Sequence, residues 1–202
     1  MLLMTVSCAT LSVAQNVAQI GTKEYATLQA AANAATAGQT VKVINDVDLT
    51  TGNGLEVGKG QDIVLDMNGH SIKGANADYK NICVSSGKLT LMDSKENSTG
   101  KIYAETPYQE GIYDKPLVEV INGGEFVMES GHINSVPAGN HQFVIGAYYN
   151  SKVIINGGTI ESVWYAINGS NDEYQSPTIT INGGLYKQLC HQSSALWHAH
   201  YQ

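Results

Sequence analysis

The 202-residue sequence contains no arginine, and its eleven basic residues are all lysines. Charged residues make up only 14% of the chain, and the formal net charge is -7 at pH 7. Nucleic acids and anionic membrane surfaces are bound through clusters of basic side chains. We therefore expect neither of them as a partner of this chain.

Cysteine and long apolar runs are also scarce. Of the three cysteines, Cys8 lies near the N-terminus, and Cys83 and Cys190 are far apart in the sequence. A disulfide framework or a zinc site needs more cysteines at closer spacing, so we expect no metal and no other cofactor. No apolar stretch reaches the ~18 residues of a membrane-spanning helix, so no membrane span is expected.

Residues 1–18 are interpreted as a secretory signal peptide or its remnant. The segment is apolar at its start and reaches the small residues Ser12-Val13-Ala14 before Gln15, which is typical of a cleavage site. It lacks a basic beginning and its apolar run is short, so an ordinary buried N-terminal segment is the alternative. A signal peptide would place the mature protein outside the cell, either secreted or on a bacterial cell surface.

The chain does contain an internal repeat. Apolar triplets that start at Phe126, Val153 and Ile179 follow one another, and each is succeeded by a corner of small residues and one more apolar position. A unit that recurs every 20–50 residues or so indicates a solenoid. The first and third residues of each triplet are apolar, which is the pattern of a strand with one buried face.

Three such strands are predicted in each repeat. The first strands are expected at 55–57, 82–84, 118–120, 143–145 and 165–167, and the second at 63–65, 89–91, 126–128, 153–155 and 179–181. The third is marked by Ile72, Ile102, Ile133, Ile160 and either Leu185 or Tyr186. This pattern predicts an all-β protein, a right-handed parallel β-helix of about five to six turns over residues 40–188, with strands ~4.8 Å apart. An antiparallel sandwich is the alternative, but it does not explain why triplet and corner recur in the same order.

Residues 22–38 are predicted to form a helix that caps the N-terminal end of the β-helix. Within Tyr25–Ala37 alanine dominates, Thr27 suits the N-cap, and Gly38 suits the first position after the helix. One face of this helix is apolar and can cover the core of the first turn. Residues 189–202 are expected to be an irregular tail or partial cap, and an uncovered C-terminal edge would allow oligomerisation.

These segments resemble a known group of proteins. The helix followed by residues 38–43, the segment 63–72, and the Ile-Asn-Gly-Gly corners at 121–124, 155–158 and 181–184 are similar to secreted bacterial proteins of the pectin-lyase-like superfamily. The resemblance covers about residues 22–188. It implies the fold but no single activity, because the superfamily includes lyases, hydrolases, adhesins and phage tailspikes. Its pectate-type lyases use an arginine base with acid-bound calcium, and a chain without arginine cannot use that mechanism.

Glu56 and Glu119 are the candidate catalytic residues. Both are predicted to point outward from the first strand, with Cys83 between them, which places them two turns or ~9.6 Å apart. That separation is compatible with an inverting glycoside hydrolase. The alternative is two solvated acids on an outer face. Asp66 and Asp93 fall near one corner, where we expect each to accept hydrogen bonds from the local backbone.

Aromatic residues give the candidate ligand-binding site. It comprises residues in and beside a long insertion, namely Tyr103, Tyr108, Tyr113, Glu105, Glu110 and Asp114. Exposed tyrosines beside acids suit stacking on sugar rings and hydrogen bonding to sugar hydroxyls. The alternative is that these tyrosines pack the loops onto the solenoid. His70 and His132 are predicted at equivalent surface positions, and a metal site is not expected at Cys190, His191, His198 and His200.

The sequence therefore favours a non-catalytic structural or adhesive module, secreted or held on the cell surface. Its expected partner is a polysaccharide or a host or cell-surface glycan, bound through the inserted loops. The alternative is a carbohydrate-active enzyme, either a glycoside hydrolase or a depolymerase like those of phage tailspikes.

Overall fold

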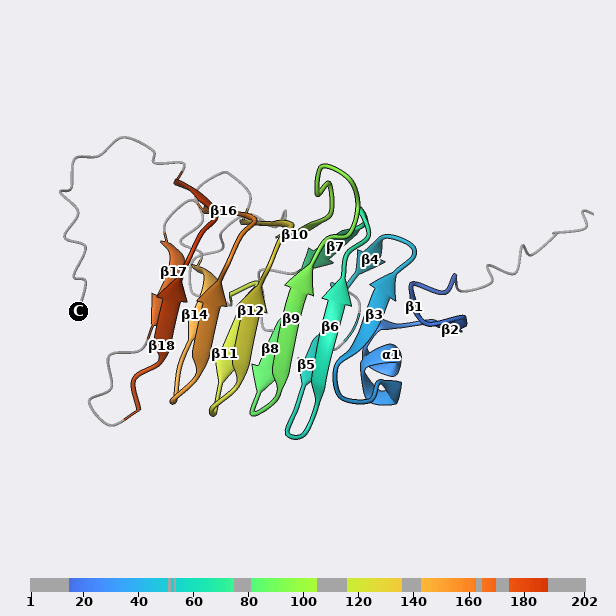
Figure 1. The fold of residues 1–202 in the computed structure, drawn as a ribbon, viewed down its shortest axis with the longest axis horizontal. Helices are drawn as coiled ribbons and strands as arrows, with labels where there is room; N and C mark the ends of the chain where they lie inside the picture. Colours follow the sequence, from blue (N-terminus) through green and yellow to red (C-terminus); the bar gives the residue numbers. More distant parts are fainter. Residues whose placement is uncertain are drawn as a thin grey trace, which may run out of the picture.

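The computed structural model describes residues 15–50, 52, 54–74, 81–104, 116–135, 143–162, 165–169 and 175–188. These residues form a solenoid of parallel strands with one short helix near the N-terminal end (Figure 1). The predicted parallel β-helix is thereby confirmed. Its right-handed sense follows the general rule for connections between parallel strands.

Three sheets form the sides of the coil. Sheet A contains β18 (Thr178–Ile181), β15 (Lys152–Ile155), β12 (Glu125–Met128), β9 (Lys88–Met92), β6 (Asp62–Asp66), β3 (Gln39–Val43), β1 (Ala18–Ile20) and β2 (Lys23–Tyr25). Sheet B contains β19 (Leu185–Gln188), β16 (Thr159–Ser162), β13 (His132–Ser135), β10 (Lys101–Ala104), β7 (Ser71–Gly74) and β4 (Val47–Asp48). Sheet C contains β17 (Tyr165–Gly169), β14 (Phe143–Ala147), β11 (Val118–Ile121), β8 (Ile82–Ser85) and β5 (Leu55–Val57).

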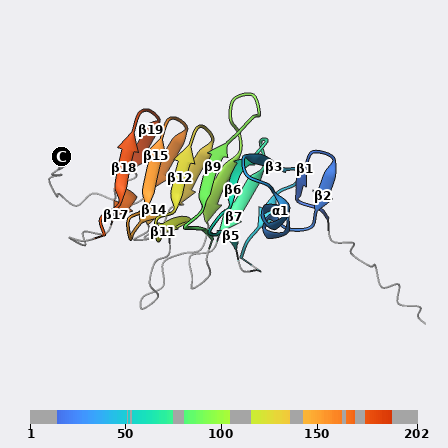
Figure 2. The same ribbon diagram turned by 60° about the horizontal axis from the view of Figure 1, so that its bottom comes forward.

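The chain passes the sheets in the order C, A, B, and each of the five strands of sheet C begins such a set of three. Figure 2 shows the strands of sheet A side by side from β18 to β3. The inward residues stack in columns: Leu89 pairs with Phe126, and Phe126 with Val153, and all three are fully buried. The predicted register of sheet A is therefore correct in every turn, because apolar alternation and the corner that follows both fix it.

The predicted register of sheet C is wrong at one step, between β11 and β14. Val118 pairs with Ile145 rather than Phe143. The predicted pairing of Phe143 with Tyr165 and of Ile145 with Ile167 is correct. The error is a shift of two residues. Such a shift leaves the same side chains facing inward, so the hydrophobic pattern alone cannot detect it.

The Ile-Asn-Gly-Gly corners occupy two different places in the coil. Residues 121–124 join sheet C to sheet A, and there Asn122 and Gly123 both have positive φ. Residues 155–158 and 181–184 join sheet A to sheet B, where only the second glycine has positive φ. In those corners the first glycine is needed for space, since a Cβ on Gly157 would meet the carbonyl oxygen of Glu129 at 2.5 Å.

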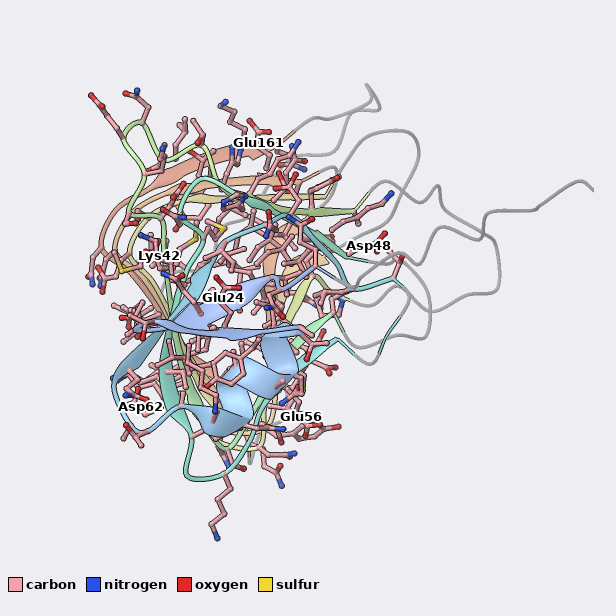
Figure 3. All side chains as sticks on the ribbon, turned by 90° about the vertical axis from the view of Figure 1, so that its right-hand side faces the viewer. Glu24, Lys42, Asp48, Glu56, Asp62 and Glu161 are labelled. Carbon is pink, nitrogen blue, oxygen red and sulfur yellow. The ribbon has the colours of Figure 1, made fainter. Side chains whose placement is uncertain are left out.

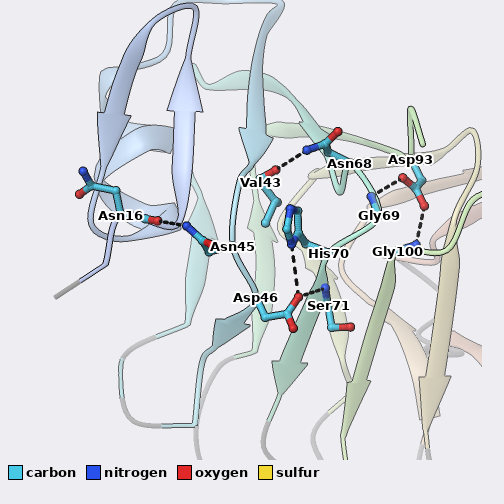
Figure 4. A network of polar contacts seen from close by, with 10 residues as sticks. All are labelled: Asn16, Val43, Asn45, Asp46, Asn68, Gly69, His70, Ser71, Asp93 and Gly100. Atoms are coloured by element: carbon cyan, nitrogen blue, oxygen red, sulfur yellow. Dashed lines mark hydrogen bonds and ion pairs between the residues drawn. The ribbon is translucent and has the colours of Figure 1, made fainter. Parts of the chain in front are cut away.

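Two buried carboxylates, Asp66 and Asp93, stabilise the corner between sheets A and B in the early turns. Asp93 accepts hydrogen bonds from the backbone N–H groups of Gly69, Lys95 and Gly100, and Figure 4 shows those from Gly69 and Gly100. Asp66 accepts from the backbone of Asn68 and from both the backbone and the hydroxyl of Ser94. The expectation that these aspartates bind local backbone is confirmed, and the bonds also reach the neighbouring turn.

The helix α1 (Leu28–Ala34) lies across the N-terminal end of the coil (Figure 3). It buries Leu28, Ala31 and Ala32 and contacts β1, β2, β3 and β5. The Thr27 side chain accepts a hydrogen bond from the Ala30 N–H, as predicted for the N-cap. The helix is shorter than predicted: Ala35 is its C-cap, and Gly38, with φ of 77°, instead lies in the turn directly before β3.

The β-hairpin β1–β2 was not predicted. It adds two antiparallel strands to the N-terminal edge of sheet A, where β1 pairs with β3. Its loop is Gly21-Thr22, and a positive φ at Gly21 but not at Thr22 is the pattern of a type II′ turn. Ala18 is fully buried in β1, so the segment interpreted as a signal peptide overlaps the folded coil at its last residue.

Candidate ligand-binding face

The longest connection in the coil, residues 105–117, follows strand β10 of sheet B. Residues 75–81 and 136–142 also connect a sheet B strand to the next strand of sheet C, while residues 93–100 connect sheet A to sheet B and residues 170–177 connect sheet C to sheet A. Insertions in a solenoid often lie on its working side. The outer surface of sheet B, which borders the longest connection, is therefore the first candidate for a binding site.

One column of outward residues runs along sheet B from turn to turn. We call it the sheet B column; its members are Asp48, Lys73, Tyr103, Asn134, Glu161 and Lys187. A second column beside it contains Ser71, Lys101, His132, Thr159 and Leu185. The two columns place carboxylate, ammonium, amide, imidazole and phenol groups on one side of the coil.

Glu161 is the most densely contacted carboxylate of this side. Its Oε1 accepts from the Lys187 ammonium at 2.8 Å, and its Oε2 accepts from the Asn134 amide at 3.0 Å. The imidazole Nε2 of His132 lies 3.3 Å from the same Oε2. The hydrogen bond from Lys187, with a smaller contribution from His132, holds the pKa of Glu161 below its usual value against the opposing effect of burial.

Tyr103 is the aromatic member of the sheet B column. It lies between Lys73 and Asn134 on the neighbouring strands and is partly exposed. The Lys101 ammonium lies 4.4 Å from the centroid of its ring, which is a cation–π contact. Lys101 therefore lies over one face of the ring, and the pair combines an aromatic ring with a positive charge.

Of the predicted ligand-binding residues, the structure places only Tyr103. Tyr108, Tyr113, Glu105, Glu110 and Asp114 lie outside the described residues. Their segment begins directly after Ala104, the last residue of β10, and so leaves the coil from the strand that carries Tyr103. Asn134, Glu161 and Lys187 were missed, although Asn134 and Glu161 are 27 residues apart, and Glu161 and Lys187 are 26 apart, close to the period of the repeat.

Glu56 and Glu119 lie on sheet C, on another side of the coil. Both pair with Cys83, so the predicted column is confirmed as a register. Glu56 is beside the N-terminal cap, where the Gln29 side chain donates to its carbonyl and accepts from its N–H. Figure 3 shows Glu56 and Glu161 on different sides of the coil.

The surroundings of Glu119 are aromatic. Gly146 is its partner on β14, and the Tyr148 ring lies over this glycine, where a Cβ would meet the ring at 2.8 Å. Burial raises the pKa of Tyr148, opposed by a hydrogen bond with Asn168, and the charge of Glu119 raises it further. The phenol of Tyr148 thus fills the space of a missing side chain, an arrangement that stabilises glycine in a strand.

The two histidines are not equivalent. His132 is the register partner of Lys101, which pairs with Ser71, so His70 lies one residue before the equivalent position. His70 contacts Asp46 at 3.4 Å in the corner (Figure 4), whereas His132 contacts Glu161 on the open side of sheet B. The predicted equivalence is wrong because His132 is the first residue of β13, whereas His70 is the last residue of the corner before β7.

No cluster of three or more metal-binding side chains occurs among the residues that the structure describes. Cys190, His191, His198 and His200 fall outside them. Within the described ranges, no helix is long and apolar enough to cross a membrane. Comparisons with known proteins found no matching family, no matching curated protein and no matching solved structure.

Proposed function

We propose that this protein is a non-catalytic β-helix that acts as a structural or adhesive module and binds glycans on the outer side of sheet B. The observation that carries the proposal is the position of Tyr103, in one column with Asn134 and Glu161 and directly before the insertion at 105–115. Phenol, amide and carboxylate groups in a row suit stacking on a sugar and hydrogen bonding to its hydroxyls.

The surroundings of the protein are part of the same proposal. We place it outside the cell, secreted or on a bacterial cell surface, and within the pectin-lyase-like superfamily. Support comes from the N-terminal sequence and from the resemblance of residues 22–188 to that group. A rigid coil with its longest connection beside sheet B suits the display of a binding surface.

Binding of the full chain to an array of neutral and acidic glycans tests the proposal. We expect at least one glycan to bind, and Tyr103→Ala to weaken that binding about tenfold, which is 1.4 kcal/mol. The matched control is Tyr149→Asn, because Tyr149 is an exposed tyrosine between sheets C and A, and its positive φ is tolerated by asparagine. No binding by the wild type, or equal loss in both variants, would contradict the proposal.

A carbohydrate-active enzyme is the second candidate function, and the shared column of Glu56 and Glu119 on sheet C favours it. Release of reducing sugar from a panel of polysaccharides separates the two proposals. The enzyme requires activity that Glu56→Gln and Glu119→Gln each abolish. The binding module requires none, and its glycan binding should survive both substitutions.

A further inference from the structure

The C-terminal end of the described coil exposes side chains that the preceding turn buries. Val153 and Ile155 of β15 are fully buried, whereas their partners on β18, Ile179 and Ile181, are 39% and 53% exposed. On sheet B, Ile160 is buried and its partner Tyr186 is 36% exposed. The inward face of the last turn is thus an apolar surface that another apolar surface could bury.

The backbone of this end is also open. Thr178 and Asn182 donate their N–H groups to the carbonyls of Ser151 and Ile155 in the preceding turn. Because N–H groups alternate in direction along a strand, those of Ile179 and Ile181 face the uncovered edge. The Asn182 side chain donates to Asn156 as well, which leaves its carbonyl oxygen as the outermost acceptor of that side-chain ladder.

The N-terminal end differs, because it is closed. Strand β1 pairs antiparallel with β3, β2 covers β1, and α1 packs beneath them. Lys23 and Glu24 add exposed charges to the outer strand, a feature that discourages pairing of strand edges. Head-to-tail stacking would have to pair β18 with this closed edge of sheet A, and the β1–β2 hairpin opposes that pairing. Contact between two copies through the open end must use the same end of both, which gives a closed dimer.

Charge and sheet geometry both permit that contact. Residues 175–188 contain a single charged side chain, Lys187, and its ammonium is paired with Glu161. The chain carries a net charge of -7, but none of its carboxylates lies within residues 175–188, so repulsion between two copies of β18 and β19 is small. Asp172 and Glu173 precede this segment and lie outside the described residues. At its N-terminal edge, sheet A already pairs β3 with the antiparallel strand β1. The twist of the sheet therefore accommodates an antiparallel strand.

We propose that two copies of this chain associate end to end, with β18 pairing antiparallel to β18 of the partner copy. The pairing would satisfy the outward N–H groups of Ile179 and Ile181 and bury the apolar face between the copies. Three short strands bury little area, so we expect a weak dimer whose population rises with concentration. A dimer would also present two sheet B faces to one glycan and raise its avidity.

Sedimentation velocity of the full chain over a wide concentration range tests this proposal. The mass of the wild type should rise from 21.6 kDa towards twice that value and stop there. Ile179→Lys and Ile181→Lys should each weaken the association at least tenfold, because both place a charge in the buried face. Thr180→Lys adds the same charge on the outer face of β18 and should dimerise like the wild type.

Hydrogen exchange identifies the surface. The amides of Ile179 and Ile181 should exchange more slowly at high concentration, while those of β2 should not change. A wild type that stays monomeric would overturn the proposal, and so would growth beyond the dimer or a dimer that survives both lysine substitutions in the apolar face. If the monomer protects these amides at every concentration, the chain's own residues cover the end and the proposal fails. Glycan binding by a monomer would leave the proposed function intact.

Discussion

The Cβ position of Gly157 lies 2.5 Å from the carbonyl oxygen of Glu129, one turn earlier in the coil. The corners between sheets A and B are therefore stacked so closely that a methyl group does not fit between them. The same distance recurs one turn later between Gly183 and Asn156. Close stacking of corners, rather than conformational freedom alone, explains the first glycine of each Asn-Gly-Gly sequence at this position.

Replacing Gly157 by alanine should consequently destabilise the protein more than the same change at Gly123. A methyl group on Gly157 would force the backbone of two turns apart, at a cost of about 2–3 kcal/mol. Gly123 has a positive φ but open space around it, so Gly123→Ala should cost only about 1 kcal/mol of backbone strain. Chemical denaturation of the two variants measures the difference. Equal losses of unfolding free energy would show that stacking of the corners is not the constraint.

Asp93→Ala should cost about 3 kcal/mol or more of unfolding free energy. The substitution leaves three backbone N–H groups, those of Gly69, Lys95 and Gly100, without their acceptor in a buried corner. Asp48→Ala is the matched control, because this exposed aspartate accepts from the backbone and hydroxyl of Thr50 at the surface, and it should cost about 1 kcal/mol or less. If the two variants unfold at the same denaturant concentration, the corner carboxylate does not have the structural role described.

The Glu161 cluster should make stability depend on pH. Its folded-state pKa is lowered, so the carboxylate contributes stability above its unfolded pKa, and this contribution is lost as pH falls through the folded value. Glu161→Gln should remove that acid-side component while leaving the rest of the pH profile in place. Unfolding free energies measured between neutral and acidic pH check this. If the unfolding free energy of Glu161→Gln changes with pH in the same way as that of the wild type, the ionised Glu161 does not contribute the stability described.

Thr27→Ala should destabilise the N-terminal cap by about 1 kcal/mol, because the Ala30 N–H loses its side-chain acceptor. Thr27→Ser keeps a hydroxyl at the same place and should restore most of the loss. Urea denaturation of both variants provides the measurement. An alanine variant as stable as the wild type would mean that the bond is not needed at this helix end.

The parallel coil could be predicted from the sequence because two independent signals agree along its strands. Apolar alternation fixes which face of each strand is buried, and the small-residue corners fix where the strand ends. In sheet A both signals are present, and Phe126, Val153 and Ile179 align as predicted. At β14 of sheet C the corner signal is weak, because Ile145 is followed by Gly146 and Ala147, and the predicted pairing of β14 with β11 is wrong by two residues.

The β1–β2 hairpin and most of the candidate binding face could not be predicted from the sequence, for different reasons. Strand β2 consists of Lys23, Glu24 and Tyr25, too short and too polar for a period-2 pattern. Outward residues are not constrained to one chemical type, so the column that contains Tyr103, Asn134 and Glu161 has no repeating identity to recognise. Tyr103 could be predicted as a ligand-binding residue because it is aromatic. Asn134 and Glu161 could be assigned to the same column only from the strand pairing of sheet B.

Mapping of a bound glycan by NMR tests the central claim most directly. Titration of the labelled full chain with a glycan selected from the array should shift the backbone amides of Tyr103, Asn134 and Glu161 on sheet B, and leave Val64, Thr90 and Ile154 on the outer face of sheet A unchanged. Shifts confined to sheet A, or centred on Glu56 and Glu119 of sheet C, would contradict the assignment of sheet B as the binding face.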